Sequence, residues 1–168
     1  MNLVREAGLT RIDGKGRYPH SMAQRWIFSL TVLVTFAFPA CFAHHLAVVV
    51  NKDNPVQNVT SAQLAKMCKG DVKKWPDGKE VVLVLHASSP GELVTLEHLN
   101  RMSSAEVKTM LANHKDFIRT VASDADVIGA VSSIPGAFGF VEEHSLNDHV
   151  TVIRVDGKLP LESGYLPH

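Results

Sequence analysis

The chain has 168 residues, of which 45% are hydrophobic, and its 17 basic and 17 acidic side chains give a formal net charge of zero. It carries no basic cluster of the kind that grips nucleic acid, which argues against nucleic-acid binding. Two cysteines are too few for a disulfide framework, and the length suits one domain better than two.

The N-terminal part contains an apolar run from Trp26 to Phe38 that follows Arg25 and is closed by small residues. A basic residue, an apolar stretch and small residues, in that order, are typical of a secretory signal peptide, here with cleavage after Ala43. The run of 13 residues is rather short for a membrane-spanning helix, which needs about 20. We therefore predict that residues 1–43 are a signal peptide and that the protein is periplasmic.

Alternatives stay open for this segment. If it is not cleaved, an apolar run extended to Ala43 could anchor the protein in a membrane with some tilt. A lipoprotein would use Cys41, although the preceding residues 38–40 match a lipobox poorly. Residues 1–21 look like a spurious extension, because a start at Met22 gives a signal peptide of ordinary proportions.

Residues 44–168 form the single predicted domain, of 125 residues, with nine Lys and three Arg against 15 acidic residues, a net charge of −3. Cys68 is the one cysteine of this part, so no intramolecular disulfide can form and packing must supply the stability. A helix would turn Leu64, Met67 and Cys68 to one face, which favours a buried small hydrophobe over a reactive thiol or an intermolecular bridge.

The first predicted elements have clear local signals. The apolar, β-branched run 46–50 predicts a strand that is covered on both faces. Thr60 and Gln63 fit a capping box for a helix over 61–69, and Gly70 is a natural C-terminal stop.

A turn over 75–78, with Pro followed by Asp and Gly, leads to a second buried strand over 81–85. Ser88-Ser-Pro-Gly-Glu92 then opens a helix in which Glu92 and Glu97 are predicted at polar positions. The predicted apolar stripe of this helix consists of Leu93, Leu96, Leu99 and Met102.

The remaining predicted elements are a helix from Ser103 to about Asn113, a loop over 114–120, a helix after Ser123 or Asp124 that buries Val127, Ile128 and Val131, and strands over 137–141 and 150–155. Strands separated by helices indicate an α/β sheet with parallel pairs and right-handed crossovers rather than a sandwich.

Several segments together carry a family resemblance: Leu46–Asn51, Asn54–Val56, Thr60–Leu64, Cys68–Gly70, Trp75–Gly78, Ser88–Gly91, Ile134–Phe140 and Val152–Gly157. In order and spacing they resemble the phosphate-type substrate-binding proteins of ABC transporters, in the type 2 periplasmic binding protein superfamily. The strongest piece, Pro135-Gly-Ala-Phe-Gly-Phe140, is similar to the family's Pro-Gly-Ala-Ile-Gly-Tyr. The resemblance covers about residues 45–157.

The resemblance implies a reduced periplasmic-binding-protein-like fold, with a mixed, mostly parallel sheet flanked by helices. It also implies a non-catalytic protein that binds phosphate or a related oxyanion and presents it to the membrane component of an ABC transporter. The chain departs from the family in two ways. The first is its length, because full receptors are about twice as long and close two lobes on the anion. The second concerns the residues at the predicted anion site. The stretch His86–Glu92 has no Arg and no Thr after its Gly, and ends in an acidic residue, so phosphate specificity does not follow. The alternative is a ligand-free interaction or sensory module that keeps the fold and docks on an envelope protein.

The best candidate for an oxyanion site is the start of the helix at Ser88–Glu92, because helix N-termini present free N–H groups and a partial positive charge. Ser88 and Ser89 could add hydroxyl donors, and Gly91 would allow close approach of the backbone. Their simpler alternative is that they only cap or turn the chain. His86 stands at the C-terminal end of a strand, where open α/β sheets bind ligands, unless it is a plain surface residue. Arg119 could clamp an oxyanion bidentately, unless it is merely solvated.

No metal site, cofactor or catalytic centre is predicted. Residues 44–168 contain eight histidines, yet none forms an i, i+4 pair on one helix and no Cys-x-x-Cys is present. The chain also lacks a nucleophile elbow, a Walker loop and a dinucleotide-binding glycine motif. These observations favour a binding protein over an enzyme.

Overall fold

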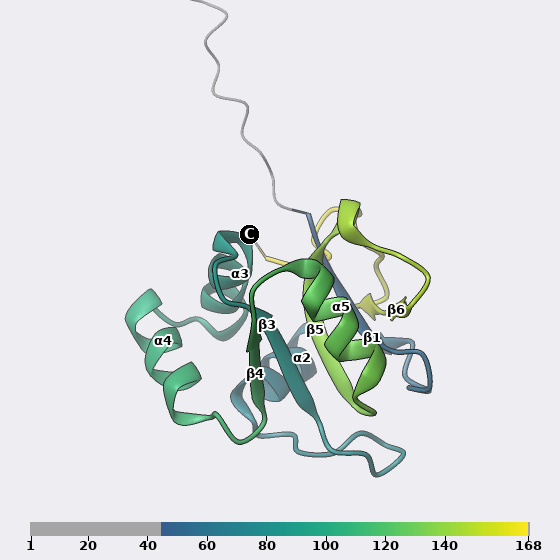
Figure 1. The fold of residues 1–168 in the computed structure, drawn as a ribbon. Coiled ribbons are helices and arrows are strands. Elements are labelled where there is room, and N and C mark those ends of the chain that lie inside the picture. The colour runs from purple at the N-terminus through teal and green to yellow at the C-terminus, as the bar shows by residue number, and fades with distance from the viewer. Residues whose placement is uncertain (1–44, 168) are drawn as a thin grey trace, which may run out of the picture. The chain divides into compact units, whose positions relative to one another are not determined.

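The computed structural model describes residues 45–167, so the predicted signal peptide and the start at Met22 lie outside the described residues. The strands are β1 (Leu46–Asn51), β2 (Asn58–Val59), β3 (Val82–His86), β4 (Ile118–Val121), β5 (Ala137–Glu142), β6 (Val150–Val152) and β7 (Arg154–Val155). The helices are α2 (Ser61–Lys69), α3 (Pro90–Asn100), α4 (Ser104–Asn113) and α5 (Asp124–Ser133), with a short 3₁₀ helix η1 (Glu143–Ser145) (Figure 1).

The central sheet has five strands in the order β4-β3-β5-β1-β6. Strand β3 runs parallel to β4 and β5, whereas β1 runs antiparallel to β5 and β6. Strands β2 and β7 form a separate parallel pair. Three of these five pairings within residues 45–167 are parallel, so the predicted fold class, a mixed sheet flanked by helices, is confirmed.

Helices cover both faces of the sheet, which explains the continuous apolar runs in β1 and β3. On one face, Ala47, Val49 and Val84 pack against Val127 and Val131 of α5. On the other face, alternate residues of the same strands pack against α2, α3 and α4 in the larger core (Figure 1). The predicted burial of Val127, Ile128 and Val131 is confirmed.

The predicted helix α2 is confirmed at both ends. The Thr60 hydroxyl oxygen accepts the backbone N–H of Gln63 at 3.1 Å, and the Gln63 side chain accepts that of Thr60 at 2.9 Å. Gly70 ends the helix in the left-handed conformation, with φ 77°. Cys68 is buried as predicted, and burial raises the pKa of its thiol well above the ordinary value, with a further contribution from Glu92, which makes the thiol unreactive.

The Pro-Gly-Ala-Phe-Gly-Phe segment joins α5 to β5 through two close backbone approaches. Gly136 has φ 82°, and a Cβ there would lie 2.2 Å from the Glu80 carbonyl oxygen. The Gly136 carbonyl accepts the indole N–H of Trp75 at 2.7 Å. A Cβ at Gly139 would lie 2.7 Å from the Val84 carbonyl oxygen. Both positions therefore need glycine, which gives a structural reason for the two glycines of this segment.

Two predictions of secondary structure were wrong. The predicted loop over 114–120 contains the edge strand β4, because Ile118 is buried and pairs with Leu83 of β3. Arg119 therefore lies in a strand. The single strand predicted over 150–155 is divided, since the chain leaves β1 at Ile153 and the N–H of Arg154 donates to the Gln57 carbonyl instead.

The predicted apolar stripe of α3 packs against the larger core, whereas the predicted polar position of Glu92 was wrong. Leu96 is buried, but Leu93 and Leu99 are only half-buried. Glu92, predicted at a polar position, is 3% exposed. Glu92, Leu93 and Leu96 also line a surface groove.

Candidate functional site

A groove of about 420 Å³ opens between α3 and α4, beyond the C-terminal end of β3. We call it the α3–α4 groove. Its apolar wall is made mainly by Leu85, Leu93, Leu96 and Leu111. Its polar lining consists of His86, Ser88, Ser89, Glu92, Lys108 and Thr120. The groove lies where open α/β sheets bind ligands, and its volume is within the range of small-molecule sites.

Three of the five predicted site residues, namely His86, Ser88 and Ser89, line this groove. Ser88 is exposed, whereas Ser89 caps α3, because its hydroxyl oxygen accepts the backbone N–H of Glu92 at 3.3 Å. Gly91 is buried in the first turn of α3 and does not line the groove. The structure thus brings the serines to the helix start as predicted, but the Ser89 hydroxyl oxygen is engaged as a cap.

Arg119 lies on the other side of the sheet from the groove. In the register of β3 and β4 it pairs with Val84, whose side chain packs in the α5 layer. Its neighbour Thr120 pairs with Leu85, and both of these residues line the groove. Because side chains alternate along a strand, Arg119 and Thr120 face opposite sides. We therefore leave Arg119 out of the proposed site.

Glu92 is the central polar group of the site. Its two carboxyl oxygens lie 3.2 and 3.0 Å from the backbone nitrogen of His86, which donates to them. Within residues 45–167, no Lys, Arg or His nitrogen forms an ion pair with this carboxyl group. Burial raises the pKa of Glu92 to about 9, and the nearby charge of Asp124 raises it further against the effect of the His86 N–H. The group is therefore protonated and neutral at pH 7.

His86 connects the groove to α5. Its Nδ1 lies 3.1 Å from a carboxylate oxygen of Asp124, and the second oxygen of Asp124 accepts the N–H of Glu142 at 2.9 Å. The imidazole thus faces the α5 side, while the backbone N–H of the same residue holds Glu92. Sequence reasoning placed His86 at the strand end but gave no signal for these two links, which depend on tertiary packing.

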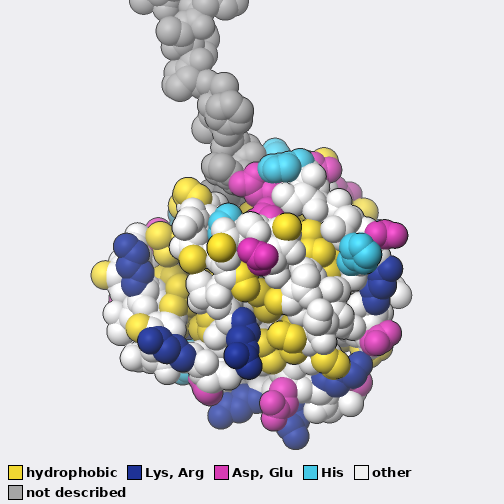
Figure 2. Space-filling view, in the orientation of Figure 1, with side chains coloured by type: hydrophobic (Ala, Val, Ile, Leu, Met, Phe, Trp, Pro, Cys, Tyr) yellow, Lys and Arg dark blue, Asp and Glu magenta, His cyan; other side chains and the backbone are white. Residues whose placement is uncertain are grey.

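Acidic residues are concentrated in one segment of the chain. Between Arg119 and Arg154 the sequence has five Asp and Glu residues and no Lys or Arg. In Figure 2, acidic and His side chains gather at the top of the visible face, whereas Lys and Arg lie mostly along the lower part and the sides. Lys108, which sequence reasoning missed, is the cation that lines the groove.

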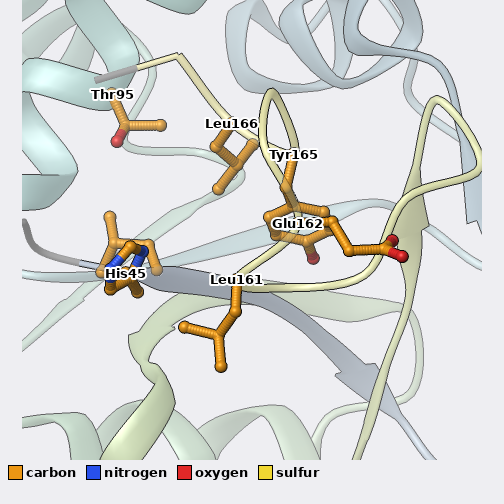
Figure 3. A pocket seen from close by; sticks show the side chains of 7 residues that line it. His45, Thr95, Leu161, Glu162, Tyr165 and Leu166 are labelled. Carbon is orange, nitrogen blue, oxygen red and sulfur yellow. The ribbon is translucent and has the colours of Figure 1, made fainter.

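A second, much smaller cavity of about 20 Å³ lies between the C-terminal segment, α3 and the start of β1. Figure 3 shows Leu161, Glu162, Tyr165 and Leu166 of that segment beside His45 and Thr95. The Tyr165 hydroxyl accepts the N–H of Val48 at 3.0 Å and donates to the Ile153 carbonyl at 2.8 Å. Burial raises the pKa of Tyr165 to about 12. This cavity is too small for a solute. The hydrogen bonds of Tyr165 join the C-terminal segment to the sheet at this place.

Neither a metal cluster nor a bilayer-spanning helix is found in the described part of the chain. No group of three or more His, Cys, Asp or Glu side chains between residues 45 and 167 is placed to hold a metal ion. None of the helices in the same range combines the length and apolarity that a bilayer span requires.

Comparison with known protein structures shows which folds the chain resembles. No family model matches the chain. Its structure is similar to an ABC-type phosphate transport receptor from Vibrio cholerae, at 23% identity and a TM-score of 0.55, over 69% of this chain and 48% of the receptor. It is also similar to PstS from Borrelia burgdorferi, at 18% identity and a TM-score of 0.56, over 69% and 49% of the two chains.

A third similar structure is the phosphate binding protein from Stenotrophomonas maltophilia, at 16% identity and a TM-score of 0.55, over 70% of this chain and 40% of that one. The matches thus span about half or less of the length of these proteins. At such identities the likeness concerns the fold. The chain has a reduced α/β fold like that of part of these phosphate-binding proteins, as the sequence resemblance predicted.

Proposed function

We propose that this chain is an exported, non-catalytic solute-binding protein that holds a small oxyanion in the α3–α4 groove and presents it to the membrane component of an ABC transporter. The single observation that carries the proposal is a solute-sized groove at the N-terminus of α3, in a fold like that of phosphate receptors. Ser88, Ser89 and the backbone of His86 lie at this groove, where a helix start favours negative charge.

A binding role without catalysis agrees with the chemistry of the groove. Its lining offers hydroxyl groups, one protonated carboxyl group and one Lys, but no nucleophile paired with a base. The His86 imidazole is engaged with Asp124 on the other face of the sheet. The proposed protein therefore holds its solute without changing it.

A second candidate, docking on an envelope protein without a ligand, is favoured by one observation. The Glu92 carboxyl group occupies the start of α3, and it accepts there an N–H that an oxyanion could have used. Under this alternative the helix start is already satisfied, and the groove takes up no solute.

A thermal-shift screen separates the two candidates. The purified protein is heated at fixed low salt with phosphate, sulfate, molybdate, arsenate and small carboxylates. A solute at a hundred times its Kd should stabilise the folded state by about 2.7 kcal/mol, which raises Tm by several degrees. Ser89→Ala should reduce this shift, whereas Thr60→Ala, which removes a similar cap far from the groove, should leave it unchanged. A flat screen on well-folded protein contradicts solute binding and favours the docking candidate.

A further inference from the structure

The α3–α4 groove has an apolar part and a polar part, and together they indicate which class of solute it would bind. One part is apolar and is formed by leucines from β3, α3 and α4, namely Leu85, Leu93, Leu96 and Leu111. The other part is polar and contains Glu92, at the start of α3, and Lys108 of α4. A small inorganic ion would contact only the second part. A solute that has both a polar head and an apolar body would use the whole groove.

The head of such a solute is defined by the buried carboxyl group. Glu92 lines the groove, accepts the His86 N–H and has no ion-pair partner within residues 45–167. Its burial favours the neutral acid, which can donate its own proton. A carboxylate accepts such a proton well, as in a carboxyl–carboxylate pair. Lys108 is exposed and makes no hydrogen bond or ion pair in the described residues, so its ammonium group is available for the single negative charge of this head.

A phosphate or sulfate dianion fits these groups less well. Asp124 lies close enough to Glu92 to influence its ionisation, so a second negative charge in the groove would be repelled. The leucine wall cannot hydrogen-bond to the additional oxygens of such an ion, and burying them without partners is costly. A monoanion with two oxygens reduces both penalties.

We propose that the α3–α4 groove binds a monocarboxylate with an apolar chain, whose carboxylate group accepts the proton of Glu92 and lies near Lys108 while its chain covers the leucine wall. This inference rests on the proposed solute-binding function and names its substrate class. The groove volume of about 420 Å³ accommodates a short aliphatic chain. Burial of each additional methylene group should tighten binding by up to roughly fourfold.

Isothermal titration calorimetry of the full chain at pH 7 with acetate, butyrate and hexanoate tests the proposal. We expect affinity to rise in that order, and hexylamine, which has the same chain with a cationic head, not to bind. Lys108→Ala should weaken hexanoate binding at least fivefold, whereas Lys115→Ala, a change of an exposed Lys outside the groove, should have no effect. Equal affinities along the series, equal effects of the two Lys variants, or preferential binding of hexylamine would each overturn the proposal.

The pH dependence of hexanoate binding provides a second test. The ligand is ionised throughout the range from pH 7 to pH 10, so changes in affinity report on the protein. The titratable groups that contact or influence Glu92 are His86 of β3, Cys68 of α2 and Asp124 of α5, and Lys108 of α4 lines the same groove. We expect binding to weaken at least tenfold as Glu92 loses its proton, and Glu92→Gln, which keeps a neutral donor, to bind at pH 7 without this loss. Identical pH profiles in both proteins would overturn the role of Glu92.

These titrations separate this inference from the proposed function. If phosphate binds and hexanoate does not, the protein is a solute-binding protein and the monocarboxylate proposal is wrong. If neither binds to the folded protein, both the proposed function and this inference are wrong. Saturable, chain-length-dependent binding supports both.

Discussion

Helices α2 and α3 begin alike and end up in different environments. Each starts with a hydroxyl N-cap, Thr60 in α2 and Ser89 in α3. Helix α2 buries only apolar residues, with Leu64 fully inside the core. Helix α3 buries Glu92 together with other polar or small side chains, and leaves two of its leucines half-buried.

The difference shows where local rules alone decide the structure. In α2 the cap, the apolar spacing and the terminal glycine all agree with the final packing. In α3 the predicted apolar stripe packs on the core, yet Glu92, at a position predicted to be polar, is buried as well. Conflicts of this kind in natural proteins tend to mark functional sites. The comparison therefore supports the α3 region as the place where a ligand binds.

Among the single substitutions, the largest expected effect on stability comes from truncating the core of α2. Leu64→Ala removes a fully buried side chain and should lower the free energy of unfolding by about 3 kcal/mol. Leu93→Ala in α3 should cost only about 1 kcal/mol, because Leu93 already faces the groove. Urea denaturation of both variants measures the difference. Equal losses would mean that Leu93 is as deeply packed as Leu64, contrary to the structure.

The next effect concerns the pH dependence of stability. The pKa of Glu92 is about 9 in the folded protein against an ordinary 4.5, so the folded state binds more protons between these values. The stabilisation of the folded state by protonated Glu92 is fully present below pH 4.5 and is lost as pH rises through 9. Unfolding free energy should therefore fall with pH by up to about 1.4 kcal/mol per unit in this range. Urea denaturation at pH 6, 7.5 and 9 measures this slope.

Glu92→Gln should remove most of that slope, because the variant has no proton to lose. Glu106→Gln is the matched control, since Glu106 is exposed and Gln can replace it in the capping box of α4. A slope that persists in Glu92→Gln would show that another group causes it.

A smaller effect is expected from the two caps. Thr60→Ala and Ser89→Ala should each lower the free energy of unfolding by about 1 kcal/mol, because each leaves a helix N–H without its acceptor. Only Ser89→Ala should also weaken the binding of a solute. Thermal unfolding with and without ligand separates the two effects, and a loss of binding in Thr60→Ala would contradict the site.

The smallest effect is expected for Arg119→Ala. The side chain is exposed on the edge strand, so stability should change by less than about 0.5 kcal/mol. Solute affinity should stay at the wild-type value, because Arg119 lies across the sheet from the groove. Calorimetry of the variant checks this, and a clear loss of affinity would place Arg119 in the site after all.

Much of the fold could be predicted from local signals, whereas the candidate site could be predicted only in part. Caps and apolar runs specified α2, β1 and β5, because their local preferences agree with their packing. Strand β4 was missed because only Ile118 of its residues is buried, and its pairing with β3 gives no sequence signal. The serines before α3 were evident. The approach of Lys108 and Thr120, and the burial of Glu92, depend on how α3, α4 and β4 pack together, which no local pattern specifies.

The position of β1 in the sheet has a consequence for the order of folding. This strand comes first among the described elements but lies between β5 and β6, so Leu46 pairs with Glu142 and Asn51 with Val150. The Val48 N–H donates to the Tyr165 hydroxyl, so this hydrogen bond also joins residues that are far apart in the chain. Contacts between residues so far apart in the chain form slowly, because a long loop must close first.

The sheet therefore cannot be completed until β5 and β6 have been synthesised. Until then, β1 has no partner strands and the sheet stays incomplete. If the proposed export is correct, this delay would keep the polypeptide in an extended, threadable form until it has passed through a translocation pore.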